Sequence, residues 1–435
     1  MFQYIEQYFQ LKQNNTTFTR EIIAGITTFM AMAYILAVQP SIMKDAGMPV
    51  EAVVVGTAII SALSTILMGI VAKYPFALAP GMGENILFTY VLVASGAFTW
   101  QQGMTVILCS GLLFLLLTVF GLREKVAELL PAPLKLGIGA VVGIFLINLG
   151  MLGTGISVPE ASHGFTLGNL SDKSVLLSIL GFFLMTFLVI RKIHGGILLG
   201  IIAITLAGVL IGITTVPTQF ISLPPSISSI TFQYDFSEVF SFKTLPLFLV
   251  FFIGDFFGTL GTLLGVSAQG GYLDKDGNLP NINKPFIVDA IATVTGSMIG
   301  MTTVTTYVES ATGISAGGRT GLTSVVTGIC FIFALFFTPL ILMIPQIATA
   351  PVLLLVGFML LDSLQHISFG ALDETLPPLS MLVFTIFTFN MTTGIAIGTL
   401  MYILMKLIKG EYKSISWGLY LLGCVFLYYI YTQVK

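Results

Sequence analysis

Charged residues are scarce in this chain: they make up 9% of its 435 residues, and the formal net charge is -2. The basic residues are spread over short polar joints rather than gathered in one patch, so nothing indicates a nucleic-acid-binding protein. Between the joints lie apolar runs of about 15 to 23 residues, and the mean hydropathy is +0.98. This pattern excludes a soluble core and predicts an all-α polytopic membrane protein.

Cysteine and histidine are equally scarce, with three of each. The cysteines stand singly in apolar runs without metal-ligand spacing, so they are interpreted as packing residues, and no metal or other cofactor is expected. The histidines fall in joints or near segment ends, which makes them poor candidates for a buried proton relay. No nucleophile stands near a base, so an enzyme is not expected either.

The apolar runs form two sets of seven predicted spans. The first set lies near residues 21–43, 51–72, 75–96, 101–121, 132–152, 173–190 and 194–214. The second set lies near residues 243–266, 285–300, 303–320, 322–344, 348–364, 376–391 and 393–409. Because seven is odd, the two sets must cross the membrane in opposite senses, which is the inverted-repeat plan of many secondary transporters.

Residues 1–20 are expected to form a cytoplasmic N-terminal segment, because this orientation leaves most basic residues of the joints in the cytoplasm. The outer joints then hold only Lys44, Lys173 and Lys243. The first apolar run has no cleavage site after it, so no signal peptide is expected. Residues 410–435 form an apolar tail, in which 416–432 are either a further span or a helix on the membrane surface.

Two predicted spans are interrupted at the same ordinal position of their sets. In the third span, residues 75–85 carry two prolines and two glycines, so residues 76–80 are expected to be extended and a half-helix to begin near Gly83. In the tenth span, the Thr-rich residues 302–308 favour extended chain, and a half-helix begins near Ser310. The two half-helix N-termini are expected to face each other at mid-membrane, where their free amides form a polar pocket.

Four polar side chains are expected at this pocket: Glu84, Asn85, Asp255 and Glu309. A carboxylate at membrane depth costs about 2.5 to 3.5 kcal/mol to insert, so it usually marks a ligand or proton pathway. Three carboxyl groups so placed cannot all be ionised cheaply, and one of them can carry a proton. The structural alternatives are a neutral acid bonded to a neighbouring helix for Asp255 and Glu309, an interfacial role for Glu84, and a helix cap for Asn85.

Phe256 and the neighbouring phenylalanines could form a stacking surface for a planar ligand, although lipid-facing packing is the ordinary alternative. The predicted substrate-binding set is completed by Thr259, Tyr307 and Ser310. Arg319 is expected at the cytoplasmic end of its half-helix, where a cation suits the C-terminal dipole. We therefore interpret Arg319 as structural.

Four motifs are similar to those of a known family. They are residues 21–36 in the first span, 79–83 in the third, and 305–311 with 316–322 in the tenth. On these motifs the chain resembles the AzgA-like purine permeases of the nucleobase-ascorbate transporter superfamily, over nearly its whole length. The resemblance implies proton-coupled purine uptake by a protein of fourteen spans. It divides the spans into a substrate-binding core domain, residues 21–121 and 243–344, and a gate domain, residues 132–214 and 348–409.

By motif position, the resemblance makes Asn85, Asp255 and Glu309 the polar site residues. The sequence departs from the family at three places: Glu84 replaces an apolar residue, Gly258 replaces a second aspartate, and Thr393 stands near a usual asparagine. The number of carboxyl groups is kept but their placement changes, which leaves the preferred purine open.

We therefore expect a proton-driven symporter in the cell membrane that takes up hypoxanthine, guanine or adenine by alternating access. Glu309 would accept hydrogen bonds from the base, amides at Ser310 and near Gly83 would donate, and Asp255 would take the coupling proton. The alternatives are an anion transporter or channel on the same fold, which the pocket acids disfavour, and a xanthine or uracil symporter. Membrane lipid and the purine are the expected partners, and the sequence leaves a homodimer open.

Overall fold

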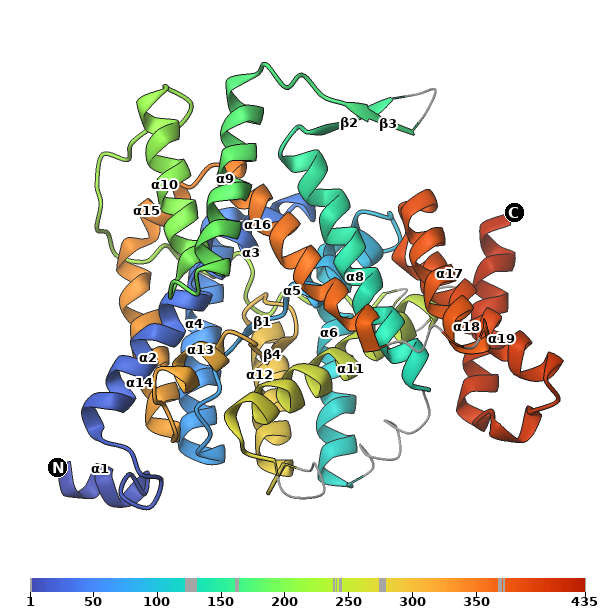
Figure 1. Cartoon of the computed structure of the whole chain (residues 1–435), viewed down its shortest axis with the longest axis horizontal. Coiled ribbons are helices and arrows are strands. Elements are labelled where there is room, and N and C mark those ends of the chain that lie inside the picture. The colour runs from blue at the N-terminus through green and yellow to red at the C-terminus, as the bar shows by residue number, and fades with distance from the viewer. Residues whose placement is uncertain are drawn as a thin grey trace.

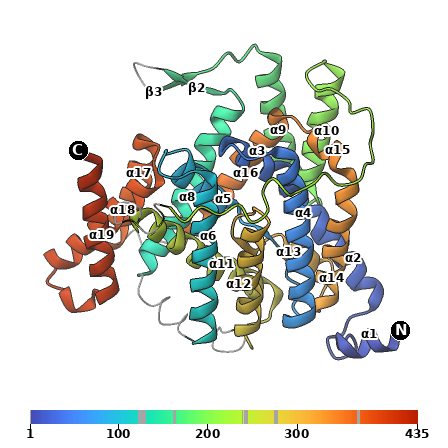
Figure 2. The ribbon, with the colours of Figure 1, turned by 180° about the vertical axis from the view of Figure 1, so that it is seen from behind.

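The computed structural model describes residues 2–121, 131–160, 164–237, 239, 241, 245–273, 279–366, 370 and 372–434. Some side chains inside these ranges, that of Asp255 among them, lie outside the description. The described chain is predominantly helical, with two short antiparallel sheets (Figures 1 and 2).

The predicted spans appear as helices in chain order. The first set contains α2 (Phe18–Met32), α3 (Ile35–Asp45), α4 (Val50–Leu67), α5 (Met82–Ile86), α6 (Trp100–Val119), α8 (Ala132–Gly153), α9 (Lys173–Ile190) and α10 (Gly196–Leu210). The second set contains α11 (Leu245–Gly270), α12 (Asn283–Met298), α13 (Ser310–Ser315), α14 (Gly321–Ala334), α15 (Thr338–Leu342), α16 (Gln346–Leu360), α17 (Leu372–Thr388) and α18 (Met391–Ile408). Terminal helices α1 (Phe2–Tyr8) and α19 (Trp417–Val434) flank them.

The two interrupted spans are the third and the tenth, as predicted. Strand β1 (Leu78–Pro80) precedes α5, and strand β4 (Val304–Thr306) precedes α13. In the described part of the chain, seven helical segments are long and apolar enough to cross a membrane by length and composition. The predicted all-α membrane fold, with two inverted sets of seven spans, is confirmed.

Shorter pieces complete the architecture. They are the hairpin strands β2 (Ser157–Glu160) and β3 (Gly164–Leu167), the π-helical turns Met68–Ala72 and Leu87–Val93, and the 3-10 turns Leu335–Phe337, Leu361–His366 and Tyr412–Ser414. The π-helical turns extend α4 and α5 directly, so α5 and its extension together form one half-helix, Met82–Val93. Figure 1 shows the β2–β3 hairpin at the end of the molecule opposite α1.

Several helices begin where a polar side chain satisfies a free backbone N–H group. The Thr99 hydroxyl accepts from the Gln102 N–H group, and the Gln102 side chain accepts from the Thr99 N–H group, so α6 begins with a capping box. The Asn390 side chain accepts from the Thr393 N–H group at the start of α18. These caps fix the ends of helices whose apolar faces alone would not define a boundary.

The helices pack mainly into two groups. In one group, α14 packs against α2 and α4, and α12 packs against α6. In the other group, α8 packs against α16 and α17, α9 against α10, and α17 against α18. Figures 1 and 2 agree in placing α2, α4 and α14 toward one side of the molecule and α17, α18 and α19 at the other.

Glycine allows very close helix crossings in each group. A Cβ atom on Gly69 would lie 2.3 Å from the carbonyl oxygen of Gly321. A Cβ atom on Gly143 would lie 2.8 Å from the carbonyl oxygen of Gly357. Because backbone atoms cannot move aside as a flexible side chain can, these contacts need glycine, and they hold each group together.

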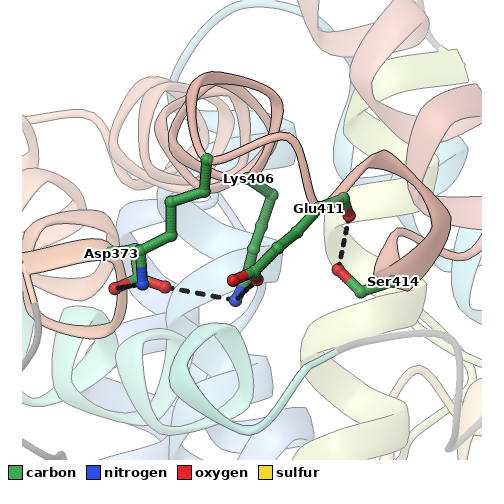
Figure 3. A network of polar contacts seen from close by, with 5 residues as sticks. Asp373, Lys406, Glu411 and Ser414 are labelled. Atoms are coloured by element: carbon green, nitrogen blue, oxygen red, sulfur yellow. Dashed lines mark hydrogen bonds and ion pairs between the residues drawn. The ribbon is translucent and has the colours of Figure 1, made fainter.

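A charged network joins α17 to the end of α18 (Figure 3). The Lys406 ammonium nitrogen lies 3.1 Å from Asp373 Oδ2 and 2.6 Å from Glu411 Oε2, and Lys409 Nζ lies 2.6 Å from Asp373 Oδ1. Ser414 donates to the carbonyl oxygen of Glu411. This network stabilises one end of the second helix group and lies outside the candidate site described below.

Candidate functional site

The site is built on the crossing of the two interrupted spans. β1 and β4 pair antiparallel, with Leu78 opposite Thr306 and Pro80 opposite Val304. All six strand residues are buried. The pairing satisfies backbone groups that neither strand can satisfy alone at membrane depth. The predicted extended stretches are therefore confirmed, and their contact with each other brings the two half-helix starts together.

In the first half, adjacent side chains of α5 face different surroundings. Glu84 lines a cavity, whereas Asn85 is fully buried among polar partners. The Asn85 amide nitrogen donates to Gln39 Oε1, and Asn85 Oδ1 accepts from the Thr302 hydroxyl. Asn85 therefore links α3 to Thr302, which precedes β4, and does not line the cavity.

Gly81 is the residue that lets Glu84 reach its position. A Cβ atom on Gly81 would lie 1.9 Å from Glu84 Oε2 and 3.1 Å from Thr305 Cγ2. The carboxyl group of Glu84 thus folds back over the start of its own half-helix. Any side chain at position 81 would displace that carboxyl group.

In the second half, Glu309 stands at the N-cap position of α13. The Tyr34 hydroxyl, from the break between α2 and α3, donates to Glu309 Oε1 at 2.5 Å. The Tyr307 hydroxyl donates to the carbonyl oxygen of Pro80 at 2.5 Å, which ties the second interruption back to the first. Both tyrosines are buried, at 2% and 5% exposed.

Ser310 is engaged within the protein. Its hydroxyl accepts from the Ala77 N–H group at 2.9 Å, and its own N–H group donates to the carbonyl oxygen of Tyr307 at 3.1 Å. The sequence predicts that the Ser310 amide donates to a ligand, whereas in the structure this amide closes the turn at the start of α13. Ser310 therefore holds the two interrupted spans together.

A cavity of about 280 Å³ lies over this crossing, between the two helix groups. This volume is near the lower end of small-molecule sites, roughly 300 to 1,000 Å³. Its polar wall comes from the first group and its mainly apolar wall from the second. The lining residues are Tyr34, Met82, Gly83, Glu84, Leu87 and Thr262, then Thr305 to Glu309, and on the second group Lys135, Ile138, Gly139, Val142, Val356, Met359 and Leu360.

The predicted residues divide into two sets. Glu84, Tyr307 and Glu309 line the cavity. Asn85, Phe256, Thr259 and Ser310 are fully buried and do not line it. The side chain of Asp255 lies outside the described residues; its backbone belongs to α11, which packs against α5, β4 and α13.

Several polar residues of the site are not predicted from the sequence. Tyr34 and Lys135 line the cavity, and Gln39 holds Asn85. Asp289 is a further buried carboxyl group, 3% exposed, in α12. Asp289 could have been found as an acid inside a predicted span, whereas Tyr34 and Gln39 carry no signal that distinguishes them from packing residues.

The far end of α13 is held by a further buried acid, Glu21. Its carboxylate accepts hydrogen bonds from the Arg319 N–H group and from the N–H and hydroxyl groups of Thr320 and Thr323. The Arg319 guanidinium donates to the carbonyl oxygen of Ile314, in the last turn of α13, and to that of Gly318, which follows the helix. The structural interpretation of Arg319 is confirmed.

The chemistry of the cavity follows from its two carboxyl groups. Glu84 and Glu309 offer oxygen acceptors beside apolar side chains, and Lys135 adds one cation at the rim formed by α8. Such a surface suits a small molecule that presents N–H donors from a flat apolar body. Within the described ranges, no group of three or more His, Cys, Asp or Glu side chains could hold a metal ion.

Comparison with known proteins gives a consistent result. The sequence profile of the Permease family matches residues 19–402. The adenine permease AdeP of Escherichia coli (strain K12) is 38% identical over 412 residues, which cover 95% of this chain and 92% of AdeP. The guanine/hypoxanthine permease PbuG of Bacillus subtilis (strain 168) is 36% identical over 441 residues, which cover 99% of this chain and 100% of PbuG.

The fold is also similar to a solved structure, the transmembrane domain of a cyanobacterium bicarbonate transporter, BicA. The TM-score is 0.63, and the alignment covers 86% of this chain and 96% of that domain. Sequence identity is 17%, so the likeness concerns the fold alone.

Proposed function

This chain belongs to the Permease family, and on that premise we propose that it takes up a purine nucleobase together with protons, by alternating access. It is a nucleobase transporter and not an enzyme, in keeping with relatives named as adenine and guanine/hypoxanthine permeases. One observation carries the proposal: each crossing half-helix contributes one carboxyl group, Glu84 or Glu309, to the same cavity.

The cavity wall matches the chemistry of a purine. A purine is a flat heterocycle with several N–H donors, so it needs acceptors at its edge and apolar contact on its faces. Glu309 and Glu84 would supply the acceptors, while Ile138, Val142 and Leu360 would contact the ring faces. Tyr34 would orient the Glu309 carboxyl group through the hydrogen bond that it donates.

An inorganic anion is the less favoured substrate, although BicA shares the fold. The carboxyl groups of Glu84 and Glu309 would repel an anion, and Lys135 offsets only one of these charges. A neutral base avoids this repulsion. Purine therefore fits the charges of the cavity better than bicarbonate or sulfate.

Proton coupling would follow from the cost of moving carboxylates through an apolar layer. An ionised acid in the membrane interior costs several kcal/mol, so protonation lowers the charge of the loaded cavity and lets it move. We assign the coupling proton to Glu309 and Asp255, the latter from its motif position in α11. Protonation of one acid would leave the other free to accept from the base.

Alternating access would come from movement of the two helix groups against each other. The proposed core domain comprises residues 21–121 and 243–344, and the proposed gate domain comprises residues 132–214 and 348–409. The packing of α2, α4 and α14 in one group, and of α8 and α16 in the other, supports this division. With the N-terminus in the cytoplasm, the end of the cavity at Lys135 would face inward.

The test is purine uptake with proton flux in membrane vesicles. We expect Glu309→Gln and Asp255→Asn each to abolish accumulation against a gradient, because neither amide can release a proton. Glu51→Gln is the matched control, since Glu51 is an exposed acid at the start of α4. Normal accumulation in both site variants would refute the site assignment.

A binding measurement separates the two substrate classes. Adenine, guanine or hypoxanthine is expected to raise the melting temperature of the detergent-solubilised protein, since a ligand that binds only the folded state stabilises it. Sulfate and bicarbonate are expected to leave it unchanged. Stabilisation by the anions alone would favour the anion transporter.

A further inference from the structure

A second cavity, of about 360 Å³, shares α8, α16 and the extension of α5 with the first. It is lined by the C-terminal part of α3, the extension of α5, the C-terminal part of α8 and the N-terminal part of α16. Its residues are Ser41, Ile42, Asp45, Tyr90, Leu149, Leu152, Gly153, Gln346, Thr349, Ala350, Leu353 and Phe389. α8 and α16 contribute to both cavities, but from opposite ends.

A buried layer separates the two cavities. Along α8, Val142 lines the first and Leu149 lines the second, a separation of about 10 Å at 1.5 Å per residue. Between them lie Phe145 and Leu146, at 2% and 0% exposed. The second cavity is thus a separate space, on the side of this layer away from Lys135.

The second cavity contains its own acid. The Tyr90 hydroxyl donates to Asp45 Oδ2 at 2.5 Å. Asp45 is exposed, and within the part of the chain that the structure describes no hydrogen bond is formed to its Oδ1, so this oxygen can accept from a ligand. Gln346, exposed on the facing helix, adds an amide that can both donate and accept.

A row of aromatic rings leads from the hairpin to this cavity. The ring centroids of Phe165 and Phe389 are 5.7 Å apart, those of Phe389 and Phe145 are 5.1 Å apart, and those of Phe145 and Tyr90 are 5.7 Å apart. Phe165 lies on β3 and is exposed, whereas Phe145 is buried. Such rings offer flat faces on which a heterocyclic base can stack.

The backbone of Phe389 is strained, an observation that is independent of its ring contacts. Its φ is +51°, in the left-handed region, and it directly precedes the N-cap residue Asn390. A bulky residue seldom occupies this conformation, and such strain tends to occur at functional sites. Asparagine or glycine would suit the turn better, yet the turn carries a phenylalanine whose ring lines the cavity.

We propose that this second cavity is an outer purine-binding site, occupied before the base reaches the central cavity. The base stacks on Phe389 and donates an N–H group to Asp45 Oδ1, while Tyr90 holds the other carboxylate oxygen. This inference rests on the proposed function and on the orientation with the N-terminus inside, which places the second cavity on the outer side.

The first experiment compares the purine KM in right-side-out and inside-out vesicles. Phe389→Asn removes the ring but suits the left-handed backbone, so the fold is preserved. Its KM is expected to rise about tenfold in right-side-out vesicles, the size of a lost stacking contact, and to stay unchanged in inside-out vesicles. Phe389→Tyr, which keeps an aromatic ring, is expected to have the wild-type KM in both kinds of vesicle. Phe387→Asn is the matched control, because Phe387 is 83% exposed.

The second experiment detects the bound base directly. Phe389→Trp is introduced together with Glu309→Gln, which disables the central cavity, and hypoxanthine or adenine is titrated while tryptophan fluorescence is followed. Saturable quenching beyond that of the Glu309→Gln protein, which keeps Trp100 and Trp417, supports the outer site. Absence of this extra quenching overturns it.

The two proposals can fail separately. If wild-type vesicles accumulate purine but Phe389→Asn changes neither KM, or changes both equally, the outer site is refuted and the proposed function stands. If wild-type vesicles accumulate no purine, the proposed function is refuted, and the outer site with it.

Discussion

The two interrupted spans share a backbone plan but hold their acids differently. In both, a three-residue strand leads into a half-helix, and the two strands pair with each other. In the first, Glu84 lies in the first turn of the half-helix, beside Asn85, whose side chain is bonded on two sides. In the second, Glu309 lies at the N-cap, and Tyr34 donates to it from another helix.

The half-helices also differ in how they end. α5 continues through a π-helical turn to Val93, whereas α13 has only six residues and is held at its far end by Glu21 and Arg319. The first half-helix is thus secured along its length, and the second at its two ends. We infer that the inverted repeat duplicates the backbone but not the roles of the side chains. The first half-helix mainly forms the cavity wall, whereas the second supplies Glu309 as the main acceptor for the substrate.

The largest expected effect comes from replacing Glu309 and Glu84, one at a time, by glutamine. Glu309→Gln is expected to lower the initial rate of purine uptake by about 100-fold, because a hydrogen bond to a charged group is worth up to about 3 kcal/mol. Glu84→Gln is expected to lower it only about tenfold, since Glu84 folds back over its own half-helix. Radiolabelled uptake in vesicles, normalised to protein content, measures both.

Both variants need a stability control, because a loss of uptake can also reflect a loss of folded protein. Melting temperatures in detergent are expected to remain within a few degrees of wild type for both. If Glu84→Gln reduces uptake as much as Glu309→Gln does, the two halves contribute equally and the inferred difference between them is wrong.

The next effect concerns the anchor of the second half-helix. Glu21→Gln is expected to lower the free energy of unfolding by about 3 kcal/mol, because it weakens hydrogen bonds to a buried carboxylate and turns one acceptor into a donor facing other donors. Unfolding of the detergent-solubilised protein measures this loss.

The control for Glu21 is Glu6→Gln, which removes an exposed ion pair with Lys12; such pairs are worth about 0 to 1 kcal/mol. Equal stability losses for Glu21→Gln and Glu6→Gln would show that Glu21 does not anchor α13.

The interruptions could be predicted from the sequence because their causes are local. Two prolines and two glycines in residues 75–85, and β-branched threonines in 302–308, disfavour helix wherever they occur. The different surroundings of Glu84 and Asn85 also follow from the sequence, because adjacent residues of a helix point to different faces. Local chemistry therefore predicted the backbone of the site well.

The partners of the site residues could not be predicted, because they come from distant parts of the chain. Tyr34 is 275 residues from Glu309, and Thr302 is 217 residues from Asn85. Nothing in the sequence around Tyr34 distinguishes it from a tyrosine that merely packs. The hydrogen bond of the Ser310 amide could not be predicted either. This N–H group donates to the carbonyl oxygen of Tyr307, in a turn that the sequence pattern does not reveal.

A smaller effect tests whether the position of Glu84 matters. Gly81→Ala adds a Cβ atom that would lie 1.9 Å from the present position of Glu84 Oε2, which is too close for both atoms to stay in place. Because a flexible carboxyl group can move aside, the fold is expected to survive while the purine KM rises about tenfold, the equivalent of one misplaced hydrogen bond. The matched control is Gly423→Ala in α19, away from the cavity, whose Cβ atom would lie 2.6 Å from Ile403 Cδ1, the end of another flexible side chain. Equal KM values for the two variants would mean that the Glu84 position is unimportant.

The smallest effect tests the tether of Glu309. Tyr34→Phe removes the hydroxyl that donates to Glu309 Oε1 but keeps the ring that packs in the cavity wall. The purine KM is expected to rise about threefold, the value of one modest hydrogen bond, with the maximal rate preserved. Tyr4→Phe, at an exposed tyrosine of α1, is the control.

Tyr307→Phe sharpens the contrast, because the Tyr307 hydroxyl bonds to Pro80 and not to Glu309. It is expected to lower the melting temperature more than Tyr34→Phe does, whereas a larger KM change for Tyr307→Phe would make Tyr307, and not Tyr34, the residue that positions the substrate.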